Sequence, residues 1–467
     1  MSLSDLSPLD YAAPALFALA LLAVGWLRRR GGVAEEFLLA GRRLSAPAFV
    51  MSLVSAWYGG ILGVSEYSYS YGLSNWFVFG LPYYLHAALF AIFLAKRARH
   101  SRLSSIPDKL AEVYGRRPAQ LGAITIFLMT MPAAYLLMLG KLISWIFGWS
   151  YPVSLAVGTV FSTIYIYFGG LRSVTGANLV QFAMMYGGFA MMVIVLYSTF
   201  GGLDFLRANV PRELFSPLGG QSFSAVLVWY FIASTTLIEP LFYERVYAAR
   251  SERLVLPGIL VCILFWALFD FFTTTTGLYA RALLPEGTDR ALAFPQLALQ
   301  VLPAGAFGLF FIALLATVVS TIDSYSFIAA AALGRDLLWR SGKREESQVP
   351  RFIRLSLVAS TLCAFLVALA AESVVSVWHA VGSIGAPVLL VPTLAAWSSR
   401  HPFPRRLVLP AMLAAGLVAL IWRLAPLLTD SGYWLGVQPI YIGLGISLAF
   451  YLPSLIRSPA RARPSRP

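Results

Sequence analysis

Long apolar stretches recur along this chain, and each is close to the length that an α-helix needs to cross a lipid bilayer. A helix rises about 1.5 Å per residue, so roughly 20 apolar residues cross a hydrocarbon core about 30 Å thick. Only 12% of the residues are charged and 59% are hydrophobic, which leaves too few polar side chains to cover a water-exposed surface. We therefore predict an all-α polytopic membrane protein. About thirteen transmembrane helices are expected, near residues 11–27, 46–71, 75–95, 120–147, 151–168, 176–200, 223–243, 254–279, 303–334, 353–371, 374–397, 407–428 and 435–455.

The polar segments between these spans are short. The longest, near residues 97–118 and 335–351, are the size of loops. The first apolar stretch is longer than the core of a signal peptide, and Arg28, Arg29 and Arg30 follow it where a cleavage site would need small residues. We interpret it as a retained span. The sequence thus predicts a single transmembrane domain over residues 1–467.

Basic residues predict the orientation of the chain. Loops on the cytoplasmic side of membrane proteins carry an excess of Lys and Arg. An N-terminus outside and a C-terminus in the cytoplasm place most basic residues inside, as expected for a multi-pass plasma-membrane protein. The net charge of +14 is then a topology signal, and no nucleic-acid partner is needed to explain it. The predicted inside segments are Arg28–Arg43, Lys96–Arg117, the turn at Arg172, Arg245–Arg253, Arg335–Arg354, Arg400–Arg406 and the tail Arg457–Arg466.

Four hydroxyl side chains recur at helical spacing in the ninth span. Thr317, Ser320, Thr321 and Ser324 stand at i, i+3, i+4 and i+7 and share one helix face, with Asp323 at its edge. Such hydroxyls often bond the carbonyl of the preceding turn or pack as small residues. The alternative is a site for a hard cation such as Na⁺, which prefers oxygen ligands. The spacing alone leaves both interpretations open.

Glycines interrupt the second span near its middle. Gly59, Gly60 and Gly63 each weaken a helix by roughly 1 kcal/mol relative to Ala, and a break here would free backbone carbonyls for an ion. Close packing of small residues against a neighbouring helix is the alternative. Glu239-Pro240 similarly interrupts a later span.

Four local patterns, in order along the chain, resemble those of the sodium:solute symporter family. Together they extend over most of its length. They are Phe37–Arg43 (FLxGR), Gly169–Val174 followed by Asn178 and Gln181 (GGLRAV…D..Q), Tyr243–Ser251 (QRxxAARS), and Ser320–Ser324 followed by Gly334–Asp336 (STxDS…xRD).

This resemblance implies a LeuT-type fold, with two inverted five-helix repeats and alternating access around a site at the membrane midplane. The repeats correspond to residues 46–200 and 223–397. One extra helix and a cytoplasmic loop precede them at 1–45, and two extra helices with a basic tail follow at 405–467. The implied function is sodium-coupled symport of a small polar organic solute.

The resemblance also implies a sodium site between the first and eighth core helices. Its ligands are the backbone carbonyls of Tyr58, Ile61 and Thr317 and the hydroxyls of Ser320 and Thr321. Sodium is the coupling ion, and no other cofactor is expected.

Three further residues are candidates for coupling: Asp323, Asn178 and Ser324. Many family members carry an Asp at the position of Asn178, where it is tied to an additional sodium site or to coupling. Because Asn178 has no charge, we predict one sodium per cycle instead of two.

Candidates for the substrate cavity lie on several predicted spans. An amino acid or similar solute is favoured, while a sugar or a monocarboxylate stays possible. The candidate residues are Glu66, Ser65, Tyr83, His86, Trp229, Thr235, Thr236, Glu239 and Trp378.

An enzyme is not expected. The sequence contains no HExxH, no GxSxG and no clustered cysteines, so no catalytic residues are assigned. Two alternatives stay open: a proton-coupled transporter of the same fold, in which Glu66 or Asp323 titrates, and a membrane sensor that binds solute without transporting it. The expected partners are Na⁺, a small solute and the lipid bilayer, and the sequence predicts no oligomeric state.

Overall fold

A computed structural model describes residues 6–27, 34–342, 345–371, 373–398, 401–428 and 432–456. The predicted inside tail Arg457–Arg466, Arg28–Arg30 and Arg400 lie outside these described residues. Within them the regular structure is helical, apart from a single β-bridge between Leu44 and Ala249. The first half contains α1 (Pro8–Leu27), α2 (Ala34–Leu39), α3 (Ala46–Trp57), α4 (Ile61–Tyr71), η3 (Trp76–Gly80), α5 (Leu81–Phe90), η4 (Ala91–Ala95), α6 (Lys96–Ser101), α7 (Ile106–Tyr114), α8 (Arg116–Thr130), α9 (Ala133–Phe147), α10 (Tyr151–Phe200) and α11 (Leu203–Asn209).

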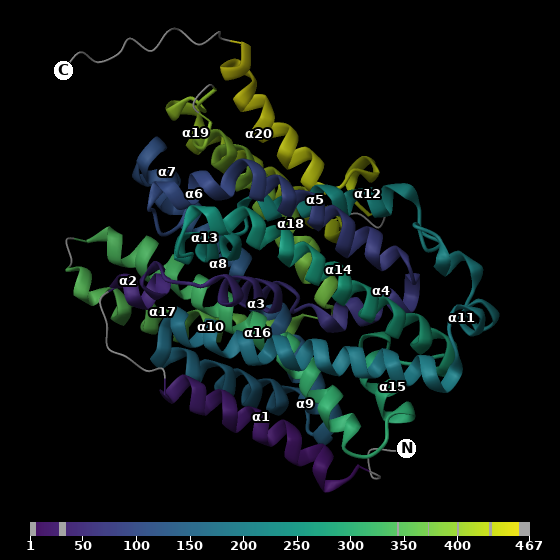
Figure 1. Cartoon of the computed structure of the whole chain (residues 1–467). Helices are drawn as coiled ribbons and strands as arrows, with labels where there is room; N and C mark the ends of the chain where they lie inside the picture. Colours follow the sequence, from purple (N-terminus) through teal and green to yellow (C-terminus); the bar gives the residue numbers. More distant parts are fainter. Residues whose placement is uncertain are drawn as a thin grey trace.

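The second half continues the helical bundle (Figure 1). It contains α12 (Phe223–Ile232), η6 (Ala233–Ile238), α13 (Pro240–Ala248), α14 (Glu252–Leu283), η7 (Arg290–Leu292), α15 (Ala293–Val301), α16 (Ala306–Ala331), η8 (Ala332–Leu338), α17 (Val349–Ala370), α18 (Val374–Ala396), α19 (Arg405–Leu428) and α20 (Pro439–Ile456). The short helical turns η2 (Ala40–Arg42), η5 (Arg212–Phe215), η9 (Trp339–Ser341), η10 (Glu346–Gln348) and η11 (Trp434–Gly436) lie between or beside them.

The membrane-spanning character predicted from the sequence is confirmed. Among the described residues, 9 helices are long and apolar enough to cross a membrane, and the bent pair α3/α4 brings the number to 10. Three shorter apolar helices, Pro8–Ala23, Tyr151–Ile164 and Pro439–Leu455, account for the remaining predicted spans. The total of thirteen stays a prediction, because these three fall short of the spanning length.

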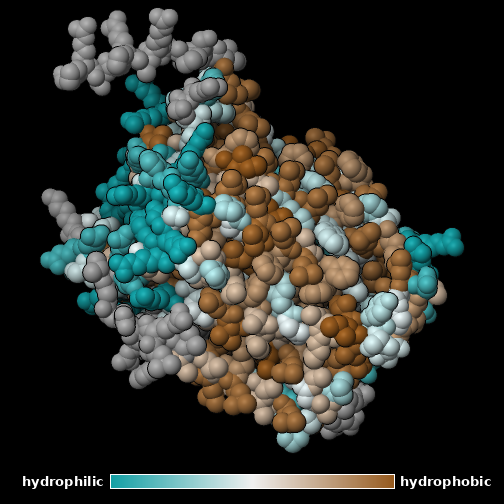
Figure 2. All heavy atoms as spheres, in the orientation of Figure 1, coloured by the Kyte–Doolittle hydropathy of each residue, from teal (hydrophilic) through white to brown (hydrophobic). Residues whose placement is uncertain are grey.

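Helix α16 lies at the centre of the bundle. In its most apolar window 83% of residues are buried, against 28% for α19 at the periphery. It packs against α3, α8, α9, α10 and α17. Peripheral helices instead expose leucines such as Leu362 on α17 and Leu417 on α19, as expected where lipid is the solvent. Figure 2 shows the resulting broad apolar surface.

The chain breaks between α3 and α4, as the glycines indicate. The two helices are bent by 61° at this break, and Tyr58 and Gly60 have non-helical backbone angles at their ends. A Cβ atom on Gly59 would lie 2.0 Å from the Thr321 Oγ1, and one on Gly60 would lie 2.0 Å from the Trp378 ring. Both glycines are therefore required by close approach of a neighbouring helix.

The turn at Gly169–Val174 divides α10 into two spans. Gly170 has φ 59° and ψ −163°, a conformation that favours glycine. A Cβ atom there would also lie 2.7 Å from the backbone carbonyl of Phe37. The two segments with family-like patterns, Phe37–Arg43 and Gly169–Val174, thus pack against each other.

Polar segments from distant parts of the sequence gather at one end of the bundle, on the left of Figure 2. The Arg42 guanidinium donates hydrogen bonds to the carbonyls of Arg102, Leu103 and Tyr247, and Arg99 donates to the carbonyl of Ala249. Predicted inside loops therefore do share one end, while its cytoplasmic location stays a prediction.

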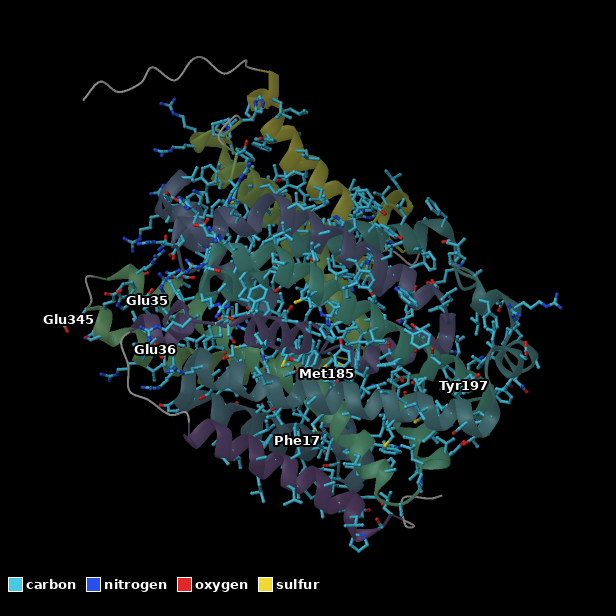
Figure 3. All side chains as sticks on the ribbon, viewed as in Figure 1. Phe17, Glu35, Glu36, Met185, Tyr197 and Glu345 are labelled. Atoms are coloured by element: carbon cyan, nitrogen blue, oxygen red, sulfur yellow. The ribbon has the colours of Figure 1, made fainter. Side chains whose placement is uncertain are left out.

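Acidic residues are part of the same end. Glu35 and Glu36, labelled in Figure 3, pair with Arg42 and Arg172 respectively, each at 2.6 Å. The Glu36–Arg172 pair connects α2 to the turn inside α10, and the Glu35–Arg42 pair connects α2 to η2.

Candidate ion and substrate sites

The hydroxyl pair of α16 faces the broken end of α3. The Ser320 Oγ lies 2.8 Å from the carbonyl oxygen of Ser55 and 2.9 Å from that of Thr317, and the Thr321 Oγ1 donates to the Ala56 carbonyl at 2.8 Å. A helix leaves its last carbonyls without intrahelical partners, and the α16 hydroxyls take up two of them. Five oxygen atoms from two helices are thus gathered at one buried point.

The remaining predicted sodium ligands flank this point. Tyr58 and Ile61 stand on the two sides of the α3/α4 break, and both are buried. The Tyr58 side chain reaches α14, where its hydroxyl donates to the Asp270 carboxyl and lies 3.0 Å from the Thr273 Oγ1. The packing against α14 thus accommodates the bulk of the Tyr58 side chain.

A polar network surrounds the three coupling candidates. The Asn178 amide donates to the Ser324 Oγ at 3.3 Å and to the Ser52 carbonyl at 3.4 Å. The Gln181 amide donates to Asp323 at 3.1 Å. Asp323 therefore bonds Gln181, which lies about one helical turn beyond Asn178. The network joins α3, α10 and α16 beside the hydroxyl pair.

Arg245 adds a buried cation to this network. Its guanidinium donates to the Ser324 Oγ at 2.9 Å and pairs with Glu244. The side chain is fully buried. The sequence pattern suggested that this residue marks the exit of a helix toward a basic loop, so burial against α16 was not predicted.

A cavity of about 160 Å³ lies beside the α3/α4 break. Residues of the break, α8, α9, η6, α16 and α18 contribute to its wall. Aromatic rings dominate the lining: Trp57, Tyr58, Phe79, Tyr83, Tyr135, Tyr325 and Trp378.

Among the described residues that line the cavity, Glu239 supplies the only carboxyl group. It lies at the break between η6 and α13, where its side chain accepts a hydrogen bond from the Leu241 amide at 3.4 Å, and it is buried. The Tyr325 hydroxyl also hydrogen-bonds it. No Lys, Arg or His is among the described residues that line the cavity.

The structure brings some of the predicted cavity residues together and separates others. Tyr83, Thr235, Glu239 and Trp378 line the cavity. The others lie outside the lining: Ser65 bonds the Arg290 carbonyl and the Phe294 amide, Glu66 is near Lys141 and Arg290, His86 bonds the Pro82 carbonyl, Trp229 packs on Phe79, and Thr236 is buried.

Tyr135 and Tyr325 are among the cavity residues that were not predicted. Tyr325 directly follows the Ser320–Ser324 pattern, which was the one available signal. Tyr135 stands in an ordinary apolar span, and nothing local distinguishes it from the other aromatic residues.

The sequence profile of the sodium:solute symporter family matches residues 37–402. The chain belongs to this family. As a symporter it is a secondary transporter and not an enzyme, and sodium is the coupling ion of the family. Both sequence predictions are confirmed.

Individual relatives cover nearly the whole chain. It is 23% identical to the sodium/pantothenate symporter of Escherichia coli over 473 residues, which covers 97% of this chain and 96% of that protein. It is 25% identical to the human high affinity choline transporter 1 over 401 residues, or 78% of this chain and 68% of that one.

A solved structure shares the fold. A Na⁺-coupled sialic acid symporter in a substrate-bound outward-open state matches with a TM-score of 0.83 at 17% identity, over 97% of this chain and 99% of that chain. The predicted LeuT-type architecture is thereby confirmed.

Proposed function

We propose that this protein couples the inward movement of Na⁺ to uptake of a small polar organic solute by alternating access. The observation that carries the proposal is the double role of the α3/α4 break. Its Gly59 packs on Thr321 of the hydroxyl pair, and the adjacent Gly60 packs on Trp378 of the aromatic cavity. Ion and solute would therefore act on the same few residues of backbone.

Sodium would bind where the α16 hydroxyls meet the end of α3. Ser320 and Thr321 donate their hydroxyl protons to α3 carbonyls. A cation accepts lone pairs, so the hydroxyl protons would turn away and the ion would bridge the two helices. The assigned ligands are the carbonyls of Tyr58, Ile61 and Thr317 with these two hydroxyls. Occupancy would thus fix the distance between α3 and α16.

One sodium per cycle is supported by the charges around Ser324. Asn178 is neutral, and the Arg245 guanidinium already donates to the Ser324 Oγ. Glu244 pairs with this guanidinium, but the guanidinium itself donates to the Ser324 Oγ and would repel a second cation at that oxygen. Asp323 and Asn178 are assigned to coupling, because their network connects α10 with α16.

We further propose the orientation suggested by the basic residues, with the N-terminus outside, the C-terminus in the cytoplasm and the protein in the plasma membrane. The end that carries the Arg42 network would then face the cytoplasm. The two five-helix repeats at 46–200 and 223–397 would move relative to each other about the break.

A proton-coupled mechanism is the second candidate. The observation that favours it is the buried Asp270 carboxyl of α14, which accepts hydrogen bonds from the hydroxyls of Tyr58 and Tyr84. Tyr58 belongs to the α3/α4 break, so protonation of Asp270 would change a hydrogen bond made by that break.

Uptake into proteoliposomes decides between the two. Purified protein is reconstituted, and uptake of labelled amino acids, sugars, monocarboxylates and organic cations is driven by a sodium gradient or by a proton gradient in potassium buffer. Accumulation that requires sodium supports the proposal. Accumulation driven by the proton gradient alone overturns it, and solute binding without any uptake identifies a sensor.

A further inference from the structure

We propose that the solute is a small organic cation, whose alkylated ammonium group sits among the aromatic rings of the central cavity beside the Glu239 carboxylate. This inference rests on the proposed function, since it names the solute class for the cavity next to the α3/α4 break.

The aromatic rings of the lining form a cage made of two separate groups of contacting rings. Trp57 stands edge-on to Tyr83 with centroids 5.9 Å apart, and Tyr135 lies 5.3 Å from Tyr325. Trp378 joins this second pair, 6.3 Å from Tyr135, and also lies 6.0 Å from Phe79. Faces of such rings carry negative potential and attract a cation within about 6 Å of the ring centroid, most strongly when water is excluded.

Charge in the cavity has one sign. Glu239 is 6% exposed, and its side chain accepts hydrogen bonds from the Leu241 backbone amide and the Tyr325 hydroxyl, both neutral groups. The other titratable side chains that face it, Tyr83 and Tyr135, are also neutral phenols. An ionised carboxyl at membrane depth is costly without a cationic partner. A cationic solute supplies that partner, whereas an anionic solute would add repulsion.

The residues that line the cavity favour an ammonium group that carries alkyl substituents. A primary ammonium has three N–H donors that each need an acceptor, and the cavity offers chiefly aromatic carbon around Glu239. Other polar groups of the lining include hydroxyls. Thr235 donates to the Ile232 carbonyl at 2.7 Å, the hydroxyls of Tyr58 and Tyr325 bond carboxyl groups, and those of Tyr83 and Tyr135 also line the cavity. Methyl groups fit ring faces without leaving donors unpaired. The cavity of about 160 Å³ suits a solute below the size of typical drug ligands.

The first test compares two molecules that differ only in charge. Choline and 3,3-dimethyl-1-butanol have nearly the same shape, with a quaternary nitrogen in one and a carbon in the other. The thermal unfolding midpoint of the wild-type protein is measured in sodium buffer with each, and with lactate as an anion. A ligand that binds only the folded state raises the midpoint by mass action. We expect a sodium-dependent rise with choline and at least about a tenfold weaker response to the neutral analogue.

Variants test which side chains produce the response to choline. Glu239→Gln keeps the shape of the side chain and removes its charge, and it should weaken the choline response about tenfold or more while leaving the response to sodium alone intact. Glu213→Gln, in an exposed segment, is the matched control and should respond as wild type does. Trp378→Phe retains an aromatic face and should retain more of the choline response than Trp378→Leu.

Two outcomes would overturn the inference. One is an equal response to choline and its neutral analogue. The other is a sodium-dependent response to lactate or to a neutral solute with none to any organic cation. Neither outcome would contradict sodium-coupled symport. The proposed function itself fails in a different way, through the absence of any sodium effect on stability or uptake with every solute.

Discussion

The α3/α4 break and the η6/α13 break both interrupt membrane-spanning segments, and the two are built from different chemistry. The α3/α4 break consists of Tyr58, Gly59 and Gly60. Its glycines pack on Thr321 of α16 and on Trp378, and the Ser320 and Thr321 hydroxyls bond backbone carbonyls. The η6/α13 break is formed by Glu239 and Pro240 and places a carboxyl against aromatic rings.

This difference suggests that the two breaks bind different ligands. Neutral oxygens at fixed positions suit a small hard cation, because many dipoles can point at it without a buried counter-charge. A carboxylate among π-faces suits a larger, soft cation that cannot be surrounded by carbonyls. If the two breaks have these separate roles, substitutions at one should change mainly the sodium response and substitutions at the other mainly the solute response.

The largest expected effect is on the hydroxyl pair. Ser320→Ala with Thr321→Ala removes two oxygen ligands and should raise the sodium concentration for half-maximal uptake by about an order of magnitude or more. Sodium-dependent uptake measures it. The matched control is Ser360→Ala with Thr361→Ala on α17, an adjacent pair whose hydroxyls bond the Leu357 carbonyl. Unchanged sodium dependence of the Ser320/Thr321 variant would remove the site assignment.

Substitution of Gly59 and of Gly60 should separate the sodium response from the solute response within the α3/α4 break. Gly59→Ala directs a methyl group at Thr321, and Gly60→Ala directs one at Trp378. Overpacking of this kind costs about 1–3 kcal/mol. We expect Gly59→Ala to raise the half-saturating sodium concentration several-fold and Gly60→Ala to raise that of the solute, both measured by uptake. The reverse ranking would contradict the assignment of the two sides.

A smaller effect is expected from restoring the carboxylate that many relatives carry. Asn178→Asp should leave the ratio at one sodium per solute, because the Arg245 guanidinium at Ser324 can pair with the new charge. Parallel uptake of labelled sodium and labelled solute gives the ratio. A ratio of two in this variant would show that Asn178 alone set the stoichiometry.

The smallest effect on transport is expected far from both breaks. Asp108, on α7 outside the spans, is buried, which by itself raises its pKa, but Arg335 and Arg340 outweigh burial and hold the pKa below the ordinary value of 3.8. A lowered pKa means that the ion pair stabilises the fold above that value and loses this contribution as the pH falls through the folded-state pKa.

Asp108→Asn should therefore lower the unfolding midpoint by a few degrees at neutral pH and leave both half-saturating concentrations unchanged. The difference from wild type should shrink as the pH falls below 3.8 and disappear below the lowered folded-state pKa of Asp108. Thermal unfolding across pH measures it, and a difference that persists undiminished in acid would show that charge is not the cause.

Much of the fold could be predicted from local sequence. Apolar length fixes where spans lie, because in lipid each helix must satisfy its own backbone hydrogen bonds. Gly59-Gly60 and Glu239-Pro240 indicated both breaks, and the Thr317–Ser324 spacing indicated one hydroxyl face. Each of these signals lies within a few residues along the chain.

Only the tertiary structure decided which side chains share a site. Tyr325, Tyr135 and Trp378 come from three different helices, and no local feature marks them as neighbours. Glu66 and Glu239 are both acidic residues in predicted spans, yet packing places only Glu239 in the cavity. The sequence determined the spans, the breaks and the family, because these depend on residues close together in the chain. Helix packing decided the cage and the burial of Arg245, because those depend on contacts between residues up to hundreds of positions apart.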